Sequence, residues 1–115
     1  MFKQGDIVLV PIPFTNLSSN KRRPVLILSN NDYNKSTNDI LVVAITSNLS
    51  DMRFGIMIKT DDLSEGELKV DLQIRADKIY TLSQDIVIKR FGALNNCIID
   101  KVKNKIDEMI NNKSS

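Results

Sequence analysis

Apolar residues along this chain gather in short runs that predict β-strands. A β-branched run at residues 6–12 contains Pro11, and Pro13 follows directly, so we expect this strand to leave its sheet there. The runs at 24–29 and 40–46 are continuously apolar, which is typical of strands buried on both faces. The first half of the chain therefore predicts a sheet of short, mostly buried strands.

Shorter runs predict that the sheet continues. Further strands fit residues 54–60, 77–81 and 85–90. Gly92 then interrupts the strand pattern. Polar, turn-forming stretches predict loops at residues 15–22, 30–39 and 60–67.

Residues 68–75 alternate between apolar and polar side chains, which predicts a strand with one buried face and one solvated face. The apolar face carries Leu68, Val70, Leu72 and Ile74. The polar face carries Lys69, Asp71, Gln73 and Arg75.

The last part of the chain has a helical period instead. One apolar stripe at four-residue spacing consists of Leu94, Ile98, Val102, Ile106 and Ile110. Asn95 or Asn96 is suited to cap the N-terminus of this helix, and we expect Cys97 beside the stripe to be a core residue. The pattern as a whole predicts a mainly β fold, a small and strongly bent β-barrel closed by a C-terminal helix.

Composition narrows the possible functions. A chain of 115 residues, with 42% hydrophobic residues, has the size and composition of one globular domain, residues 1–115. It has no histidine, which excludes histidine acid–base chemistry, and one cysteine, which excludes a disulfide framework. No apolar run is long enough for a membrane span or forms an N-terminal signal core, so we expect a cytoplasmic protein.

A cationic triplet is the first candidate site. Lys21, Arg22 and Arg23 end a polar loop, and Pro24 then begins a buried strand. A guanidinium held at such a rigid edge can grip a phosphate with two parallel hydrogen bonds. The alternative is a solvated basic turn, and the net charge of +2 does not by itself indicate a polyanionic partner.

Other candidates lie at strand ends and on the polar strand face. Thr46 ends an apolar strand, where its hydroxyl could donate to a phosphate oxygen, although threonine also simply favours strands. Gln73 and Arg75 could extend an anion-binding surface, or they could pair with Asp71 or Asp77. The acidic residues between 61 and 67 lack the spacing of a calcium loop, so they do not indicate a metal site.

Six short fragments follow one another along the chain. They are Gly5–Val8 (GDIV), Pro13–Thr15 (PFT), Arg22–Leu28 (RRPVLIL), Val43–Ser47 (VAITS), Gln73–Ile79 (QIRADKI) and Gly92–Leu94 (GAL). In their order and spacing, these fragments resemble the MazF/PemK family of toxins. The resemblance covers nearly the whole chain up to the final helix.

The resemblance implies the toxin of a bacterial type II toxin–antitoxin pair. Its fold would be an SH3-like barrel with a C-terminal helix, usually a homodimer. Its activity would be cleavage of single-stranded RNA, often mRNA, without metal or cofactor, leaving a 2′,3′-cyclic phosphate and a 5′-hydroxyl. A disordered antitoxin tail would block the RNA groove, and operator DNA would be bound only through the antitoxin.

The resemblance also assigns roles to residues. The family's functional arginine and threonine fall on Arg23 and Thr46, which we therefore expect to be catalytic. The substrate-binding residues that we expect are Lys21, Arg22, Ser18, Ser19, Gln73 and Arg75. Two departures are a short, glycine-free loop at 16–21 and Leu72 where many members have a small hydroxyl residue, so no cleavage sequence is implied.

Two other classes of function remain open from the sequence. A gyrase poison on the same barrel would use a tryptophan-containing tail, and this chain has no tryptophan. The second class of function is a barrel that binds RNA or a peptide without catalysis. A proline-rich peptide site needs clustered aromatic residues, whereas only 5% of the residues here are aromatic. An uncut RNA bound with salt-dependent affinity would identify a noncatalytic binder.

Overall fold

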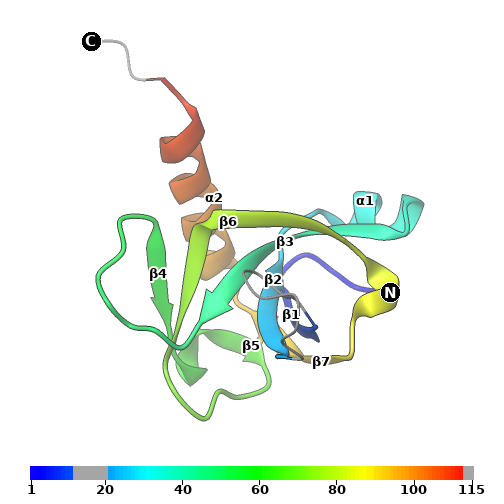
Figure 1. The fold of residues 1–115 in the computed structure, drawn as a ribbon, viewed down its shortest axis with the longest axis horizontal. Helices are drawn as coiled ribbons and strands as arrows, with labels where there is room; N and C mark the ends of the chain where they lie inside the picture. The colour runs from blue at the N-terminus through cyan, green and yellow to red at the C-terminus, as the bar shows by residue number, and fades with distance from the viewer. Residues whose placement is uncertain (12–20, 113–115) are drawn as a thin grey trace.

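The computed structural model describes residues 1–11 and 21–112. In them, seven strands form one curled antiparallel sheet in the order β4-β6-β3-β2-β1-β7-β5 (Figure 1). The strands are β1 (Asp6–Val10), β2 (Arg23–Ile27), β3 (Asp39–Thr46), β4 (Gly55–Ile58), β5 (Leu63–Glu65), β6 (Leu72–Ser83) and β7 (Lys89–Leu94). The helices are α1 (Asn31–Ser36) and α2 (Asn96–Ile110), with short 3-10 turns at Thr60–Asp62 and Gln84–Ile86.

An irregularity in β6 allows the sheet to curl. Val43 of β3 pairs with Ile79, but its neighbour Ala44 pairs with Arg75, so three residues of β6 have no partner on β3. Such a bulge bends a strand and increases its twist. The first part of β6 can therefore pair with both β4 and the end of β3, while its second part pairs with the start of β3.

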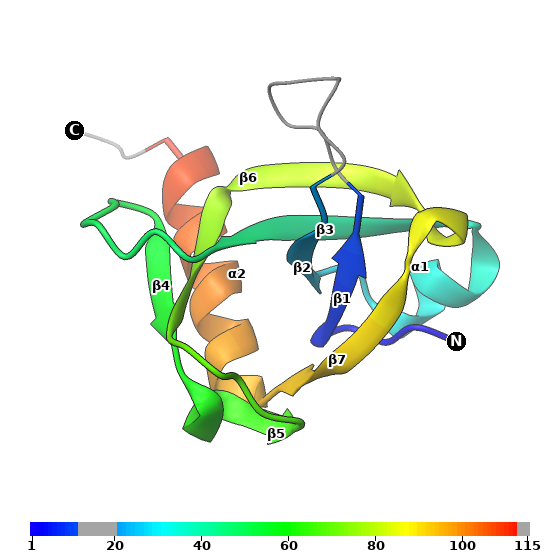
Figure 2. The same ribbon diagram turned by 60° about the horizontal axis from the view of Figure 1, so that its bottom comes forward.

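The helix α2 closes the curl. Figure 2 shows it lying across the open side of the sheet, beside β4 and β6. Ile98, Ile99 and Val102 are buried in one cluster with sheet residues such as Ile7 and Ile74. Burying each such side chain stabilises the fold by about 1.5–3 kcal/mol relative to leaving it exposed. The predicted bent, mainly β fold with a closing C-terminal helix is confirmed.

The sheet buries a second apolar cluster on its other face. It consists of Val8, Val10, Val25, Ile27, Ile40 and Val42. Because the strands β1, β2 and β3 supply residues to both clusters, the prediction that residues 24–29 and 40–46 are buried on both faces is confirmed. The sheet face that carries this second cluster continues beyond Val25 and Val42 toward the end of the sheet where Arg23 and Thr46 lie.

Several predicted boundaries are wrong. The stretch 30–39 was expected to be a loop, but it contains α1, whose N-cap Asn30 accepts a hydrogen bond from the backbone amide of Tyr33. The turn expected at 60–67 contains β5, which pairs with β7. The strand expected at 68–75 begins only at Leu72, and Val70 is 62% exposed rather than buried.

The remaining differences lie in the second half of the chain. The expected strand 77–81 is part of the long β6. Of the expected strand 85–90, only the last two residues belong to a strand, because β7 begins at Lys89 and Gln84–Ile86 forms a 3-10 turn. Gly92 does not interrupt the sheet but lies within β7, where a Cβ atom would come within 2.2 Å of the Glu65 carbonyl oxygen of β5. Cys97 is exposed, not in the core, and Ile110 is 65% exposed where α2 extends beyond the sheet (Figure 1).

Candidate functional site

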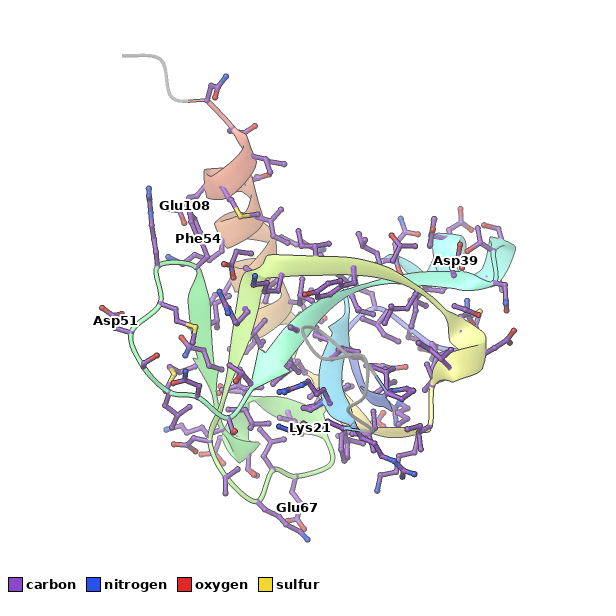
Figure 3. The ribbon with its side chains drawn as sticks, viewed as in Figure 1. Lys21, Asp39, Asp51, Phe54, Glu67 and Glu108 are labelled. Atoms are coloured by element: carbon purple, nitrogen blue, oxygen red, sulfur yellow. The ribbon has the colours of Figure 1, made fainter. Side chains whose placement is uncertain are left out.

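The candidate site lies at the end of the sheet where β2 begins and β3 ends. Val25 and Ala44 are paired across these strands. Arg23 and Thr46 each lie two residues beyond this pair, and the alternation of side chains therefore assigns both to the face of Val25 and Ala44. Figure 3 shows Lys21 near this end of the sheet and Asp39 at the opposite end of β3.

The three cations of the triplet are presented differently. Arg23 belongs to β2, pairs with Val10 of β1 and is half-buried. Lys21 and Arg22 precede the strand and are exposed. The backbone of Arg23 is thus fixed by the ladder, which suits a guanidinium that must hold one geometry, while its two neighbours can follow a flexible polyanion.

The hydroxyl group of Thr46 is oriented by the chain that follows it. Its Oγ1 accepts a hydrogen bond of 3.1 Å from the backbone amide of Asn48. Such a local turn fixes the oxygen, and its hydrogen must then point away from that amide. Thr46 is half-buried, so this arrangement can offer a donor to an anion at the sheet end.

Gln73 is not on a solvated face, and that expectation is wrong. It lies directly opposite Thr46 in the β3–β6 ladder and is only 3% exposed. Its Nε2 donates to the carbonyl oxygens of Asn48 at 2.9 Å and Ser50 at 3.0 Å. The segment after β3 therefore folds back over Gln73, and this geometry favours a role other than direct contact with substrate.

The position of Gly55 on β4 makes room for this glutamine. A Cβ atom at Gly55 would come within 1.9 Å of the Oε1 atom of Gln73. Neither Gly55 nor Asn48 was singled out from the sequence. The turn-forming residues after Thr46 were a signal for Asn48, whereas the need for glycine at 55 depends on packing between strands.

Arg75 has the acidic partner that the sequence offered as an alternative to anion binding. Its guanidinium donates to Asp77 through both Nε, at 3.3 Å, and Nη2, at 2.9 Å. The two side chains are 33% and 32% exposed. The carboxylate neutralises part of the charge that Arg75 would bring to an anion, although the guanidinium has further donors.

Asp6, Arg90 and Glu65 form a second ionic group at the far end of β1. Arg90 Nε lies 3.1 Å from Asp6 Oδ1, and Arg90 Nη2 lies 2.8 Å from Glu65 Oε2. Hydrogen bonds to Glu65 and then to Asp6 raise the pKa of Arg90 above its ordinary value. This group joins β1, β7 and β5, so it is a structural element remote from Arg23.

The remaining predicted residues, Ser18 and Ser19, lie outside the described part of the chain. Within residues 1–11 and 21–112, no three acidic or cysteine side chains cluster in a way that could hold a metal ion. In the same residues, no helix has both the length and the apolar character needed to cross a membrane.

Comparison with known proteins gives a consistent result. A family model described as PemK-like, MazF-like toxin of type II toxin–antitoxin system matches residues 3–110. No curated protein sequence matches the chain.

Several solved structures have the same fold. A mycobacterial endoribonuclease in complex with its cognate antitoxin superposes with a TM-score of 0.76 at 17% identity, covering 100% of both chains. A MazE–MazF structure from Deinococcus radiodurans gives 0.77 at 20% identity over 94% of each chain. The Mycobacterium tuberculosis toxin MazF-mt6 gives 0.72 at 17% identity over 90% of this chain and 93% of that one.

Proposed function

Since the chain belongs to the family of PemK-like, MazF-like toxins of type II toxin–antitoxin systems, we propose that it is an endoribonuclease that cleaves single-stranded RNA without a metal ion. Two similar structures are named as endoribonucleases, which supports this activity. The observation that carries the proposal is the common position of Arg23 and Thr46, two residues beyond the paired Val25 and Ala44 on one sheet face.

The proposed reaction is a transesterification within the RNA strand. The 2′-oxygen attacks the adjacent phosphorus and loses its proton, the bond from phosphorus to the 5′-oxygen breaks, and that oxygen takes up a proton. The products are a 2′,3′-cyclic phosphate and a 5′-hydroxyl. Negative charge grows on the nonbridging oxygens in the transition state, so the protein must supply donors there.

Arg23 and Thr46 are the donors that we assign to this charge. An arginine guanidinium stays protonated at neutral pH and can bind two phosphate oxygens at once. The Thr46 hydroxyl, fixed through the Asn48 amide, orients one nonbridging oxygen. Holding the phosphate between two fixed strands also favours the in-line geometry of attack, which alone can lower a barrier substantially.

The exposed cations extend the site along the strand backbone. Lys21 and Arg22 are suited to contact phosphates that flank the cleaved one. Arg75 would add a weaker contact because Asp77 shares its charge. Ser18 and Ser19 complete the set of proposed substrate contacts.

The proposal extends to partners. The mycobacterial and Deinococcus structures contain an antitoxin, which supports a cognate antitoxin for this chain. We propose in addition that a disordered tail of this antitoxin occupies the RNA site. We place residues 1–115 in the cytoplasm as one toxin domain that forms a homodimer and reaches operator DNA only through the antitoxin.

The chemical groups at the RNA ends that cleavage leaves test this proposal. Purified protein should cut a single-stranded RNA to give a 2′,3′-cyclic phosphate, and a substrate with one 2′-deoxynucleotide at the mapped cut should resist cleavage there. Binding without cutting would identify a noncatalytic RNA barrel instead. Inhibition of gyrase supercoiling with RNA left intact would identify a gyrase poison.

A further inference from the structure

The segment that follows β3 is held by one buried side chain. Gln73 uses both hydrogens of its amide on the carbonyls of Asn48 and Ser50. Asn48 is itself the residue whose backbone amide orients the Thr46 hydroxyl. Its side-chain oxygen accepts from the Ser50 amide at 3.0 Å, which closes the turn.

These contacts form a continuous connection from β6 to the Thr46 oxygen. Gln73 is fixed in the ladder opposite Thr46, so its reach to the two carbonyls defines where the segment 48–50 lies. Buried polar groups whose donors are all used hold a single geometry, and removing one of them leaves unpaired carbonyls. The orientation of the Thr46 hydroxyl therefore depends on a side chain that need not touch RNA.

We propose that Gln73 is a positioning residue, which fixes the Thr46 hydroxyl through the 48–50 segment, and that Gly55 is required because it leaves space for the Gln73 amide. This inference rests on the proposed nuclease function of Thr46. It replaces the direct substrate contact expected for Gln73 from the sequence.

Gln84 offers a matched control at the other end of β3. Its Nε2 donates to the backbone carbonyls of Asn34, Thr37 and Asp39, so it clamps a loop by the same chemistry. The Gln73→Ala and Gln84→Ala variants each remove one such clamp. Only Gln73→Ala should impair cleavage, because only its loop leads to Thr46.

The first experiment separates kcat from KM for RNA cleavage. Gln73→Ala should lower kcat roughly ten- to a hundredfold, because it misplaces the Thr46 donor, while KM changes less than about threefold. Gln84→Ala should keep kcat within about twofold of wild type. A rise in KM with kcat unchanged would overturn the proposal and restore Gln73 as a substrate-binding residue.

The second experiment is a double-mutant cycle with Gly55. Gly55→Ala alone should lower kcat, because its Cβ would displace an amide oxygen that lies within 1.9 Å. In the Gln73→Ala background the clash is gone, so adding Gly55→Ala should change kcat less than about twofold. If the two losses in kcat multiply in the double variant, Gly55 is not required for the space that it leaves to the Gln73 amide.

Amide hydrogen exchange tests the connection without any activity. The backbone amides of Asn48 and Ser50 donate within the turn, so Gln73→Ala should speed their exchange about tenfold or more. The Leu41 amide, which donates to Ser29 Oγ, should not change. Unaltered exchange at 48 and 50 would overturn the inference, whereas a wild-type protein that cuts no RNA would overturn only the proposed function.

Discussion

Thr46 of β3 and Gln73 of β6 are direct partners in the antiparallel ladder, and both are linked to the backbone of Asn48. Thr46 accepts from the amide of that residue, and Gln73 donates to its carbonyl. One peptide segment therefore couples a half-buried hydroxyl at the sheet end to a fully buried amide. The position of the Thr46 oxygen is therefore tied to the sheet through the segment that follows β3.

Substitutions at Thr46 should separate its hydroxyl from its shape. Thr46→Val keeps the branched side chain that favours a strand but removes the donor, and we expect a loss in kcat of roughly a hundredfold. Thr46→Ser retains the hydroxyl and should keep most of the activity. Single-turnover cleavage of one labelled RNA measures both, and equal rates for Val and Ser variants would contradict the assigned role.

Arg22 should contribute to RNA binding through its charge alone. Because it is exposed beside the site, Arg22→Ala should raise KM for RNA with little change in kcat. The slope of log affinity against log salt concentration should fall by about 0.7, the value for one phosphate contact on a single strand. A titration in several potassium concentrations gives this slope, and an unchanged slope would place Arg22 outside the RNA path.

The ion pair of Arg75 and Asp77 should limit RNA affinity. Asp77→Asn removes the negative charge next to the guanidinium, and we expect the affinity for RNA to increase by roughly two- to fivefold at low salt, the range of one exposed ion pair. Glu108→Gln, which breaks the exposed Lys105–Glu108 pair on α2, is the control and should leave affinity unchanged. Equal effects of both variants would mean that only net charge matters.

Arg90 should matter for stability and not for cleavage. The Asp6 side chain is 4% exposed, so Arg90→Met leaves a buried carboxylate with the Lys3 amide but without its guanidinium partner. We expect the free energy of unfolding to fall by about 1.5–3 kcal/mol. Glu65→Gln changes a side chain that is 62% exposed and should cost less than about 1 kcal/mol. Denaturant unfolding of both variants compares them directly.

Local patterns were sufficient to predict the strands that are apolar over their whole length. The runs that became β2 and β3 and the stripe of α2 are dominated by burial, which the sequence expresses directly. Short elements with polar sequences were missed. The six residues of α1 depend on its Asn30 cap, and the three residues of β5 form a strand only because β7 lies beside them.

The candidate site was predictable only in part. The position of Arg23 before a proline and of Thr46 at a strand end could be inferred from the pattern of apolar runs along the chain. The burial of Gln73 could not be inferred, because alternation assigns a side chain to a sheet face but does not show which segment covers that face. The covering segment, 48–50, reaches Gln73 across more than twenty residues of sequence, and Gly55 allows the contact.

The most direct test of the proposed site is the effect of Arg23→Ala on cleavage of single-stranded RNA in EDTA. The wild-type protein should cut, and the variant should lose at least about a hundredfold in kcat while it unfolds at the same denaturant concentration. Lys103→Ala, which removes an exposed cation on α2, should cut like wild type. Undiminished cleavage by Arg23→Ala, or wild-type cleavage only after magnesium is added, would contradict the assignment of Arg23 and the metal-independent reaction.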